Sequence, residues 1–400
     1  MKIAILRETK NPPDHRVPFT PSQCQQLMRD YPGLEICIQP DTNRCYSNEE
    51  FTLHGIALQE DVSNCDLLAG VKEVKIDYLI PGKAYMFFSH TAKKQKHNLE
   101  LLRTAIKRNI QLIDYEYLTD SNRQRLVAFG RWAGVVGAYN ALRAYGIRYG
   151  KYTLKPAWQC KDKSEIIQYL SEINIPKQRI VLTGGGRVAS GALEILNDVG
   201  FKAVSPEEFL KGNDTSVYTQ LDPSYYVKHK QGKEFNQSHF FSNPSEYENA
   251  FLPFTKVADI YIACHFWDPR SPVLMSAEDM STNDFKIQII ADISCDTPGP
   301  IPSTLRASTI AEPFFGYNAL TSQESDAFNL KNITIMSVDN LPGELPRDAS
   351  EDFGSKLSTE VIPSFLGIGD PSIIQRATIT NSGKLTDTFS YLQAFVDGNE

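Results

Sequence analysis

Short apolar runs alternate with longer amphipathic stretches along almost the whole chain, and this alternation limits the fold more than any other feature of the sequence. Residues 93–109 show the amphipathic type, because Leu99, Leu102 and Ile106 recur at the spacing of one helix face. Apolar strands joined by helical crossovers build parallel sheets covered by helices. The runs expected to be strands are KIAIL (2–6), EICIQ (35–39), DLLAGV (66–71), YMFFS (85–89), QLIDYEYL (111–118), RIVLTG (179–184), FKAVS (201–205), ADIYIACH (258–265), IQIIADIS (287–294) and ITIMSVDN (333–340).

The strand pattern starts twice, which predicts two Rossmann-like, doubly wound α/β domains with parallel sheets and an active-site cleft between the domains. Residues 1–135 are expected to form a discontinuous catalytic and substrate domain with 346–400, because the amphipathic stretch 350–366 can pack back on it. Residues 136–345 are expected to form the domain that binds NAD(P). Within this domain, residues 206–255 are polar and aromatic without a clear period, so we interpret them as an insertion.

Charge and residue usage exclude other classes of protein. The net charge is −7 and the lysines and arginines are scattered, which argues against nucleic acid as a partner. No stretch reaches the roughly 18 apolar residues of a membrane helix, and the first apolar run is too short for a signal peptide. The cysteines are widely spaced without a C-x-x-C pair, so we expect reduced thiols and a cytoplasmic protein. No metal is expected, because the histidines lack a known metal spacing, and we interpret His54, His97, His229 and His239 as structural or solvent-facing.

A glycine-rich turn follows the apolar run RIVLT and precedes a helical pattern. The residues Gly184-Gly185-Gly186-Arg187-Val188-Ala189 fit G-x-G-x-x-A. Gly184 permits the tight turn, Gly186 lets a pyrophosphate approach the backbone, and Ala189 and Gly191 keep the helix close to the sheet. The free N–H groups and the positive dipole of the helix then face the phosphates. The context favours a dinucleotide site over a plain strand–turn–helix.

The acid that usually binds the adenosine ribose, about 20 residues after the glycines, is missing from its expected place. FKAV ends at Ser205, with Glu207 and Glu208 just beyond. Ser205 is therefore the candidate at this position. NAD is the expected cofactor, and NADP remains open.

Several separate segments, taken together, resemble the lysine-forming saccharopine dehydrogenases, within the wider alanine dehydrogenase and transhydrogenase group. The strings FSHTAKKQ and SVDNLPGELPRDAS are far more specific for this family than the glycine loop. The segments lie in the family's order and cover most of the chain outside 150–178 and 206–255. They are LRETKNPPDHRVPFTP (6–21), AGVKE (69–73), FFSHTAKKQ (87–95), LIDYEYLTDSNRQRLVAFGRWAG (112–134), GGGRVASGA (184–192), IIADISCDTPGPIP (289–302) and SVDNLPGELPRDASEDF (337–353).

The resemblance implies an NAD(P)-dependent oxidoreductase that converts saccharopine, NAD and water into lysine, 2-oxoglutarate and NADH. It implies that Lys72 takes a proton from the secondary amine of the substrate, and that His90 acts as acid and base while the imine is hydrated and cleaved. A lysine can serve as a base only if burial or nearby cations depress its pKa. The paired acids Asp114 and Glu116 are candidates for tuning either residue.

The same resemblance implies the binding residues. Arg16 and Arg125 match residues that bind substrate carboxylates, Gln95 a residue that contacts substrate, and Phe129 a pocket residue. On the cofactor side it implies Gly186, Arg187, Phe266, Ile293, Val338, Asp339, Asn340 and Leu341, which join Gly184 and Ser205 of the glycine-loop argument.

The sequence departs from the family's pattern at Ser205, at Gln124, where the family has an arginine, and in the length of 206–255. These departures leave the substrate open within amino acids and 2-oxo acids, so we keep two alternatives. The chain is an alanine-type amino-acid dehydrogenase in the first and a nucleotide-binding sensor without turnover in the second. The presence of both Lys72 and His90 argues against the sensor. Neither monomer nor homo-oligomer is excluded.

Overall fold

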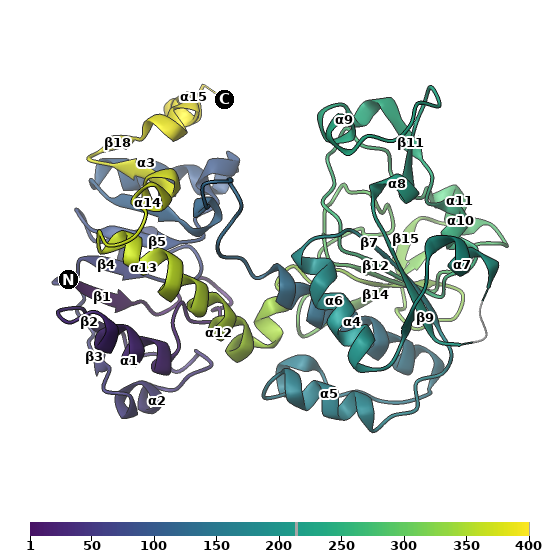
Figure 1. Cartoon of the computed structure of the whole chain (residues 1–400), viewed down its shortest axis with the longest axis horizontal. Coiled ribbons are helices and arrows are strands. Elements are labelled where there is room, and N and C mark those ends of the chain that lie inside the picture. Colours follow the sequence, from purple (N-terminus) through teal and green to yellow (C-terminus); the bar gives the residue numbers. More distant parts are fainter. Residues whose placement is uncertain (213–214, 400) are drawn as a thin grey trace. The chain divides into compact units, whose positions relative to one another are not determined.

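The computed structural model describes residues 1–212 and 215–399, and the chain divides into two compact units. Unit 1 consists of Met1–Phe129 and Pro346–Glu400, and unit 2 consists of Gly130–Leu345. Each unit is built on its own sheet (Figure 1). No helix in the described part of the chain is long and apolar enough to cross a membrane.

The sheet of unit 1 has eight strands in the order β18-β17-β6-β5-β4-β1-β2-β3. Its parallel part runs outward from β1 in both directions, so the sheet is doubly wound and its direction of winding changes between β1 and β4. The strands β17 and β18 are antiparallel additions at one edge. The strands are β1 (Lys2–Ile5), β2 (Glu35–Ile38), β3 (Ala57–Leu58), β4 (Leu67–Ala69), β5 (Ala84–Phe87), β6 (Gln111–Asp114), β17 (Thr378–Asn381) and β18 (Lys384–Leu385).

Helices of unit 1 begin where the sequence supplies caps. Thr20 and Ser47 each form a capping box, with Gln23 and Glu50 three residues on. The helix expected over 93–109 starts only at Leu99, after two short 3-10 turns. The helices are α1 (Pro21–Asp30), α2 (Asn48–Leu53), α3 (Leu99–Lys107), α12 (Pro346–Lys356), α13 (Ile362–Phe365), α14 (Ser372–Ala377) and α15 (Gln393–Asp397), with the π-helix η8 (Leu357–Val361) and the 3-10 turns η1 (Ile76–Tyr78), η2 (Thr91–Lys93), η3 (Lys96–Asn98), η4 (Tyr115–Tyr117) and η9 (Asp387–Leu392).

The sheet of unit 2 has the order β15-β14-β16-β13-β12-β7-β9-β8. Its winding reverses between β7 and β12, and β14 and β15 are antiparallel. The prediction of two doubly wound α/β domains with parallel sheets is confirmed, and each sheet has additional antiparallel strands at one edge. Of these edge strands, β15, β17 and β18 are short or polar and lack the apolar runs that mark buried parallel strands, whereas β14 has the largely apolar sequence FFGYN. The strands are β7 (Arg179–Thr183), β8 (Lys202–Ala203), β9 (Val217–Leu221), β12 (Ile260–Ala263), β13 (Ile289–Asp292), β14 (Phe314–Asn318), β15 (Gln323–Ser325) and β16 (Ile333–Met336).

The interpretation of 206–255 as an insertion is wrong for its first part. β9 lies inside the main sheet, between β7 and β8, and pairs with β7 over its whole length. This strand was not predicted because the polar residues Thr219 and Gln220 interrupt its apolar run, although Thr219 is buried. The later part does form a separate small sheet, β10 (Val227–His229) with β11 (Tyr247–Asn249). Residues 213 and 214 lie outside the described residues.

Two long helices of unit 2 cross at glycines. A Cβ at Gly191 in α6 would lie 1.8 Å from the carbonyl oxygen of Arg131, and a Cβ at Gly134 in α4 would lie 1.8 Å from that of Val188. Gly191 thus keeps α6 close to α4, which corrects the expectation that it serves helix–sheet contact. The helices are α4 (Gly130–Tyr149), α5 (Lys163–Ser171), α6 (Arg187–Asp198), α7 (Pro206–Lys211), α8 (Pro223–Tyr226), α9 (Gln237–Ser242), α10 (Leu252–Thr255) and α11 (Ala277–Ser281), with the 3-10 turns η5 (Ala157–Gln159), η6 (Pro244–Glu246) and η7 (Leu341–Glu344).

Candidate functional site

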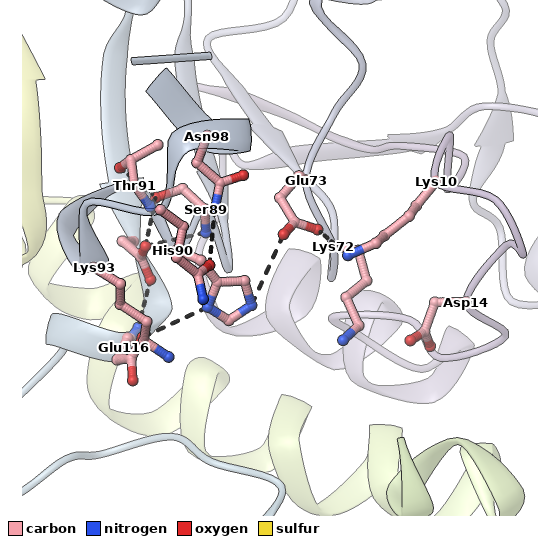
Figure 2. A network of polar contacts seen from close by, with 12 residues as sticks. Lys10, Asp14, Lys72, Glu73, Ser89, His90, Thr91, Lys93, Asn98 and Glu116 are labelled. Atoms are coloured by element: carbon pink, nitrogen blue, oxygen red, sulfur yellow. Dashed lines mark hydrogen bonds and ion pairs between the residues drawn. The ribbon is translucent and has the colours of Figure 1, made fainter. Parts of the chain in front are cut away.

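The carboxyl ends of four neighbouring strands of unit 1 carry most of the polar residues predicted for catalysis. β4 and β5 pair in parallel, so Lys72 and His90, each three residues past its strand, emerge at the same edge. β1 leads to Glu8 and β6 leads to Glu116 at this edge. The edge includes the point between β1 and β4 where the winding reverses, and such points bind ligands in open α/β sheets. Figure 2 shows Lys72, His90 and Glu116 of this group.

A buried glutamate holds the backbone at Lys72. The carboxylate of Glu8 accepts the N–H of Val71 at 2.7 Å and the N–H of Lys72 at 3.0 Å. Burial raises the pKa of Glu8 to about 8, against the opposing effect of these N–H groups. The Lys72 side chain lies beside Asp14 (Figure 2). Burial, and then the nearby Arg16 cation, lower the pKa of Lys72, which is what a lysine base requires.

His90 stands between two carboxylates. Its Nε2 is 4.0 Å from Glu73, and its Nδ1 is 3.7 Å from Glu116 (Figure 2). Glu73 also binds Lys10 at 3.0 Å, and Glu116 binds Lys93 at 3.1 Å. Because Glu73 follows Lys72 in the chain, it links the two predicted catalytic residues.

The two acids interpreted as tuning residues have different partners. Burial opposes ionisation of Glu116, but His90, Lys93 and Arg125 outweigh it and lower the pKa of Glu116 to about 2. Asp114 instead accepts the N–H of Ser89 at 3.0 Å and its hydroxyl at 2.5 Å. Asp114 therefore fixes the residue before the histidine, and Glu116 is the acid that faces the imidazole.

The backbone at His90 is in the left-handed region, with φ of 53°. This region is uncommon for residues other than glycine, and such positions cluster at functional sites. Lys94 also lies there, with φ of 55°. These two positions bound the turn η2 and delay the start of α3.

The residues predicted to bind substrate carboxylates lie in unit 1 and are already engaged. Arg16 is buried and donates two hydrogen bonds to Asp14, at 2.9 and 2.6 Å, so a substrate carboxylate would share the guanidinium with Asp14. Its guanidinium lies 4.1 Å from the ring centroid of Phe129, which stacks on Phe353. Arg125 is 40% exposed and lies 3.7 Å from Glu116.

Gln95 is exposed and lies at the start of η3, five residues after His90. Its side-chain oxygen accepts a hydrogen bond from Asn98 at 3.3 Å. The side-chain amide is therefore held at the end of the same turn that carries the histidine.

The glycine loop of unit 2 lies between β7 and α6, as the sequence predicts. Gly184 has φ of 102°, and a Cβ there would lie 2.7 Å from the carbonyl oxygen of Cys264. A Cβ at Gly185 or Gly186 would meet nothing within 4 Å, so the space above the loop is open. Gly186 caps α6 without a side-chain hydrogen bond, and Arg187 beside it is exposed. The N-terminal N–H groups of α6 can receive a phosphate.

The other residues predicted for cofactor binding follow the strands on the far side of the winding reversal. Phe266 follows β12 and is 89% exposed, and Ile293 follows β13 directly. Val338 and Leu341 have buried side chains, so only their backbone groups can serve a ligand. The remaining two, Asp339 and Asn340, are exposed and partly exposed.

His265 is a residue at this edge that the sequence reasoning did not select. Its Nδ1 lies 2.8 Å from the hydroxyl of Thr183. Burial lowers the pKa of His265 to about 4, so the ring is neutral near pH 7. Sequence alone could not separate it from an ordinary buried histidine.

Asp222 was also missed, and it changes the interpretation of Ser205. The strand that ends at Ser205 was expected beside the glycine loop, but β8 lies at the edge of the sheet and pairs only with β9. Ser205 caps α7, where its hydroxyl accepts the N–H of Glu208. Asp222 directly follows β9, the strand that does adjoin the loop, and caps α8 through one carboxylate oxygen, which accepts the N–H of Ser224 at 2.9 Å. Gly184 N–H donates to Leu221 O at 3.0 Å. An acid after a β-branched strand, VYTQLD, was the available signal.

The comparisons with known proteins agree with this architecture. Residues 4–136 match the family model "Alanine dehydrogenase/PNT, N-terminal domain". The chain is 30% identical to an Arabidopsis thaliana alpha-aminoadipic semialdehyde synthase over 98% of its own length, but spans only 41% of that protein. It is 26% identical to an Emericella nidulans saccharopine dehydrogenase [NAD(+), L-lysine-forming], over 92% of both chains. A solved L-alanine dehydrogenase has the same fold, with a TM-score of 0.68 and 14% identity over the whole of both chains.

Proposed function

The chain belongs to the saccharopine dehydrogenase family, within the alanine dehydrogenase and transhydrogenase group, and from this premise we propose an NAD(P)-dependent dehydrogenase that acts on the C–N bond of an amino-acid-derived secondary amine. The observation that carries the proposal is the pairing of a lysine with a lowered pKa and a histidine at one edge of unit 1, joined by Glu73. The substrate class is saccharopine-like, which joins lysine to 2-oxoglutarate.

Lys72 is the base in this proposal. A secondary amine must lose its proton before it can be oxidised, and a neutral lysine amine can accept that proton. Burial and Arg16 favour the neutral form of Lys72. The two hydrogen bonds from Val71 and Lys72 N–H groups to Glu8 hold the lysine in place.

His90 moves protons in the later steps. Water adds to the imine carbon, and the amine that leaves must then be protonated, which requires one group that both accepts and donates a proton near neutral pH. The carboxylates of Glu73 and Glu116 lie on either side of the imidazole, 4.0 and 3.7 Å from its nitrogens. Arg16 and Arg125 hold substrate carboxylates, for which the planar guanidinium is well suited.

Unit 2 binds the cofactor in this proposal, and its residues fit a dinucleotide. The open space over Gly185 and Gly186 and the uncapped start of α6 suit a pyrophosphate. The carboxylate of Asp222 suits the ribose hydroxyls and repels a 2′-phosphate, so we propose NAD rather than NADP. A bound nicotinamide would supply the hydride acceptor. The cytoplasm remains the predicted location.

The test measures NADH oxidation with two different substrate pairs, and then compares a Lys72 variant with a control variant. The purified chain with NADH is given lysine plus 2-oxoglutarate, or pyruvate plus ammonia, and the loss of NADH absorbance is followed. The proposal expects oxidation with the first pair, and a loss of at least about 100-fold in kcat for Lys72→Met. Lys75→Met, an exposed lysine three residues on, is the matched control and should leave the rate unchanged.

Two results would contradict the proposal. Turnover with pyruvate and ammonia alone would identify an alanine-type enzyme, which needs no pocket for a second amino acid. NADH binding without turnover of any amino or oxo acid, with Lys72→Met indistinguishable from the unchanged chain, would identify a sensor.

A further inference from the structure

Two histidines and a glutamate meet at the small sheet of unit 2, away from the residues of the proposed reaction, although the sequence spacing predicted no metal site there. His229 ends β10, His239 lies in α9 and Glu246 ends the turn before β11. One ligand atom from each lies within 4.8 Å of the other two. His229 Nε2 is 3.3 Å and His239 Nε2 is 3.9 Å from the same oxygen of Glu246. Ligand atoms around tetrahedral zinc are about 3.3 Å apart, so small side-chain movements suffice.

His239 is prepared to act as a ligand through Nε2. The hydroxyl of Tyr247 donates to the carbonyl oxygen of Asn236 at 3.3 Å, and the same hydroxyl lies 3.1 Å from Nδ1 of His239. With its proton given to Asn236, the hydroxyl oxygen accepts from Nδ1–H. This leaves the lone pair on Nε2, which faces Glu246. Metal-bound histidines are usually oriented by such a hydrogen bond at the other ring nitrogen.

His229 supplies the second, independent observation. Its side chain is only 2% exposed, and among the described residues its Nε2 has no hydrogen-bond partner, because Glu246 lies 3.3 Å away without hydrogen-bond geometry. A buried polar atom without a hydrogen bond is costly unless another partner satisfies it. The atom points toward Glu246 and the open face, where His239 and Glu246 are 38% and 46% exposed.

We propose that His229, His239 and Glu246 form a binding site for a divalent transition metal, with zinc as the preferred ion. Two imidazole nitrogens and one carboxylate oxygen are the donor set that zinc takes, and this set does not suit magnesium or calcium, which prefer oxygen alone. The ion joins α9 to the end of β10 and to the turn η6 that leads into β11. The segment that it fixes begins at α8, directly after Asp222 (Figure 1).

Metal binding at His229 must break one hydrogen bond that the ring now forms. Nδ1 of His229 accepts the N–H of Gln231 at 3.1 Å, so the neutral ring without metal carries its proton on Nε2. A metal at Nε2 moves that proton to Nδ1 and releases the Gln231 amide. The turn is also closed by the Gly232 N–H, which donates to the His229 carbonyl oxygen at 2.9 Å. Metal binding must therefore change the environment of one particular backbone amide.

The experiment uses the full chain without a histidine tag, stripped by a chelator and titrated with Co²⁺, followed by competition with Zn²⁺. We expect one equivalent to bind with the visible absorption of four-coordinate cobalt, Zn²⁺ to displace it, and the melting temperature to rise. His239→Gln and Glu246→Gln, both at partly exposed positions, should each weaken binding by at least about tenfold. Hydrogen exchange at the Gln231 amide should become faster on metal binding.

Glu248→Gln is the matched control, because Glu248 is an exposed acid on β11 that pairs with Lys228 instead. It should bind cobalt like the unchanged chain. The proposal is overturned if no stoichiometric metal binds, or if His239→Gln and Glu246→Gln bind as well as Glu248→Gln. In that outcome a proton shared between His229 and Glu246 accounts for the cluster. Because the readouts are metal content and stability, they do not depend on whether the chain is a dehydrogenase.

Discussion

The protonation state of Lys72 sets the direction in which pH acts on the proposed reaction. Lys72 must be neutral to accept a proton, and burial with Arg16 lowers its pKa from the ordinary value for lysine. For amine oxidation we expect kcat/KM to rise with pH and to level off below about 10.4, the usual lysine pKa. The pH–rate profile of the unchanged chain is the measurement.

The amine of the substrate also titrates and can itself make the rate depend on pH. The pH–rate profile of Lys72→Met distinguishes this contribution from that of the lysine base. If Lys72 is the base, the residual activity of Lys72→Met should depend on pH only through the substrate. A profile of unchanged shape in Lys72→Met would show that another group takes the proton.

At the level of elements, the position of β9 is the basis of the proposed preference for NAD. Because β9 adjoins β7, Asp222 follows the strand next to the glycine loop, where we propose that a carboxylate binds the ribose hydroxyls, whereas Ser205 is one strand farther out. We expect Asp222→Ser to weaken NADH binding and to shift the ratio of NADH to NADPH affinity toward NADPH by about tenfold or more. Fluorescence titration with the two reduced cofactors measures this ratio.

Ser205→Ala is the control for the same titration. Its hydroxyl caps α7, so its loss should cost some stability without changing the ratio. A ratio that moves with Ser205 and not with Asp222 would restore the serine as the ribose-side residue.

The crossing of α4 and α6 gives a second prediction at this scale. A Cβ at Gly191 would lie 1.8 Å from the carbonyl oxygen of Arg131, so Gly191→Ala must push the helices apart. We expect a loss of about 1–3 kcal/mol or more in the free energy of unfolding, although alanine favours helices over glycine. Denaturant unfolding measures the loss.

Gly185→Ala provides the contrast, because the added Cβ meets nothing within 4 Å. Its stability should stay close to that of the unchanged chain. Equal stability of Gly191→Ala and Gly185→Ala would mean that the two helices are not held at this contact.

For the whole molecule, we propose that unit 2 binds the cofactor and unit 1 binds the substrate, so the two ligands should protect different backbone amides from hydrogen exchange. Hydrogen exchange with NADH should slow in the amides of 184–190 and of the chain around Asp222, all in unit 2. Exchange with lysine and 2-oxoglutarate should slow around 70–73 and 89–95, in unit 1. NADH protection confined to unit 1 would contradict the assignment of the cofactor to the glycine loop.

Apolar periodicity was enough to predict most of the fold, because parallel strands buried on both faces must be apolar throughout. It could not reveal β9, whose buried Thr219 and exposed Gln220 break the pattern, or the antiparallel edges. The family motifs selected Lys72 and His90, and their common strand edge follows from the sheet order. Asp222 and the contact of Glu8 with the Lys72 backbone depend on which strands pair, and this pairing is not written in any short stretch of sequence.

The edge strands β17 and β18 of unit 1 come from residues made after all of unit 2. On the ribosome, the edge of β6 therefore stays without its partner strand until Thr378–Asn381 has left the exit tunnel. Unit 2 can complete its own sheet earlier. The nascent chain thus passes through a stage in which unit 2 is folded and the sheet of unit 1 still lacks its edge strands. At this stage a chaperone can bind the exposed strand edge.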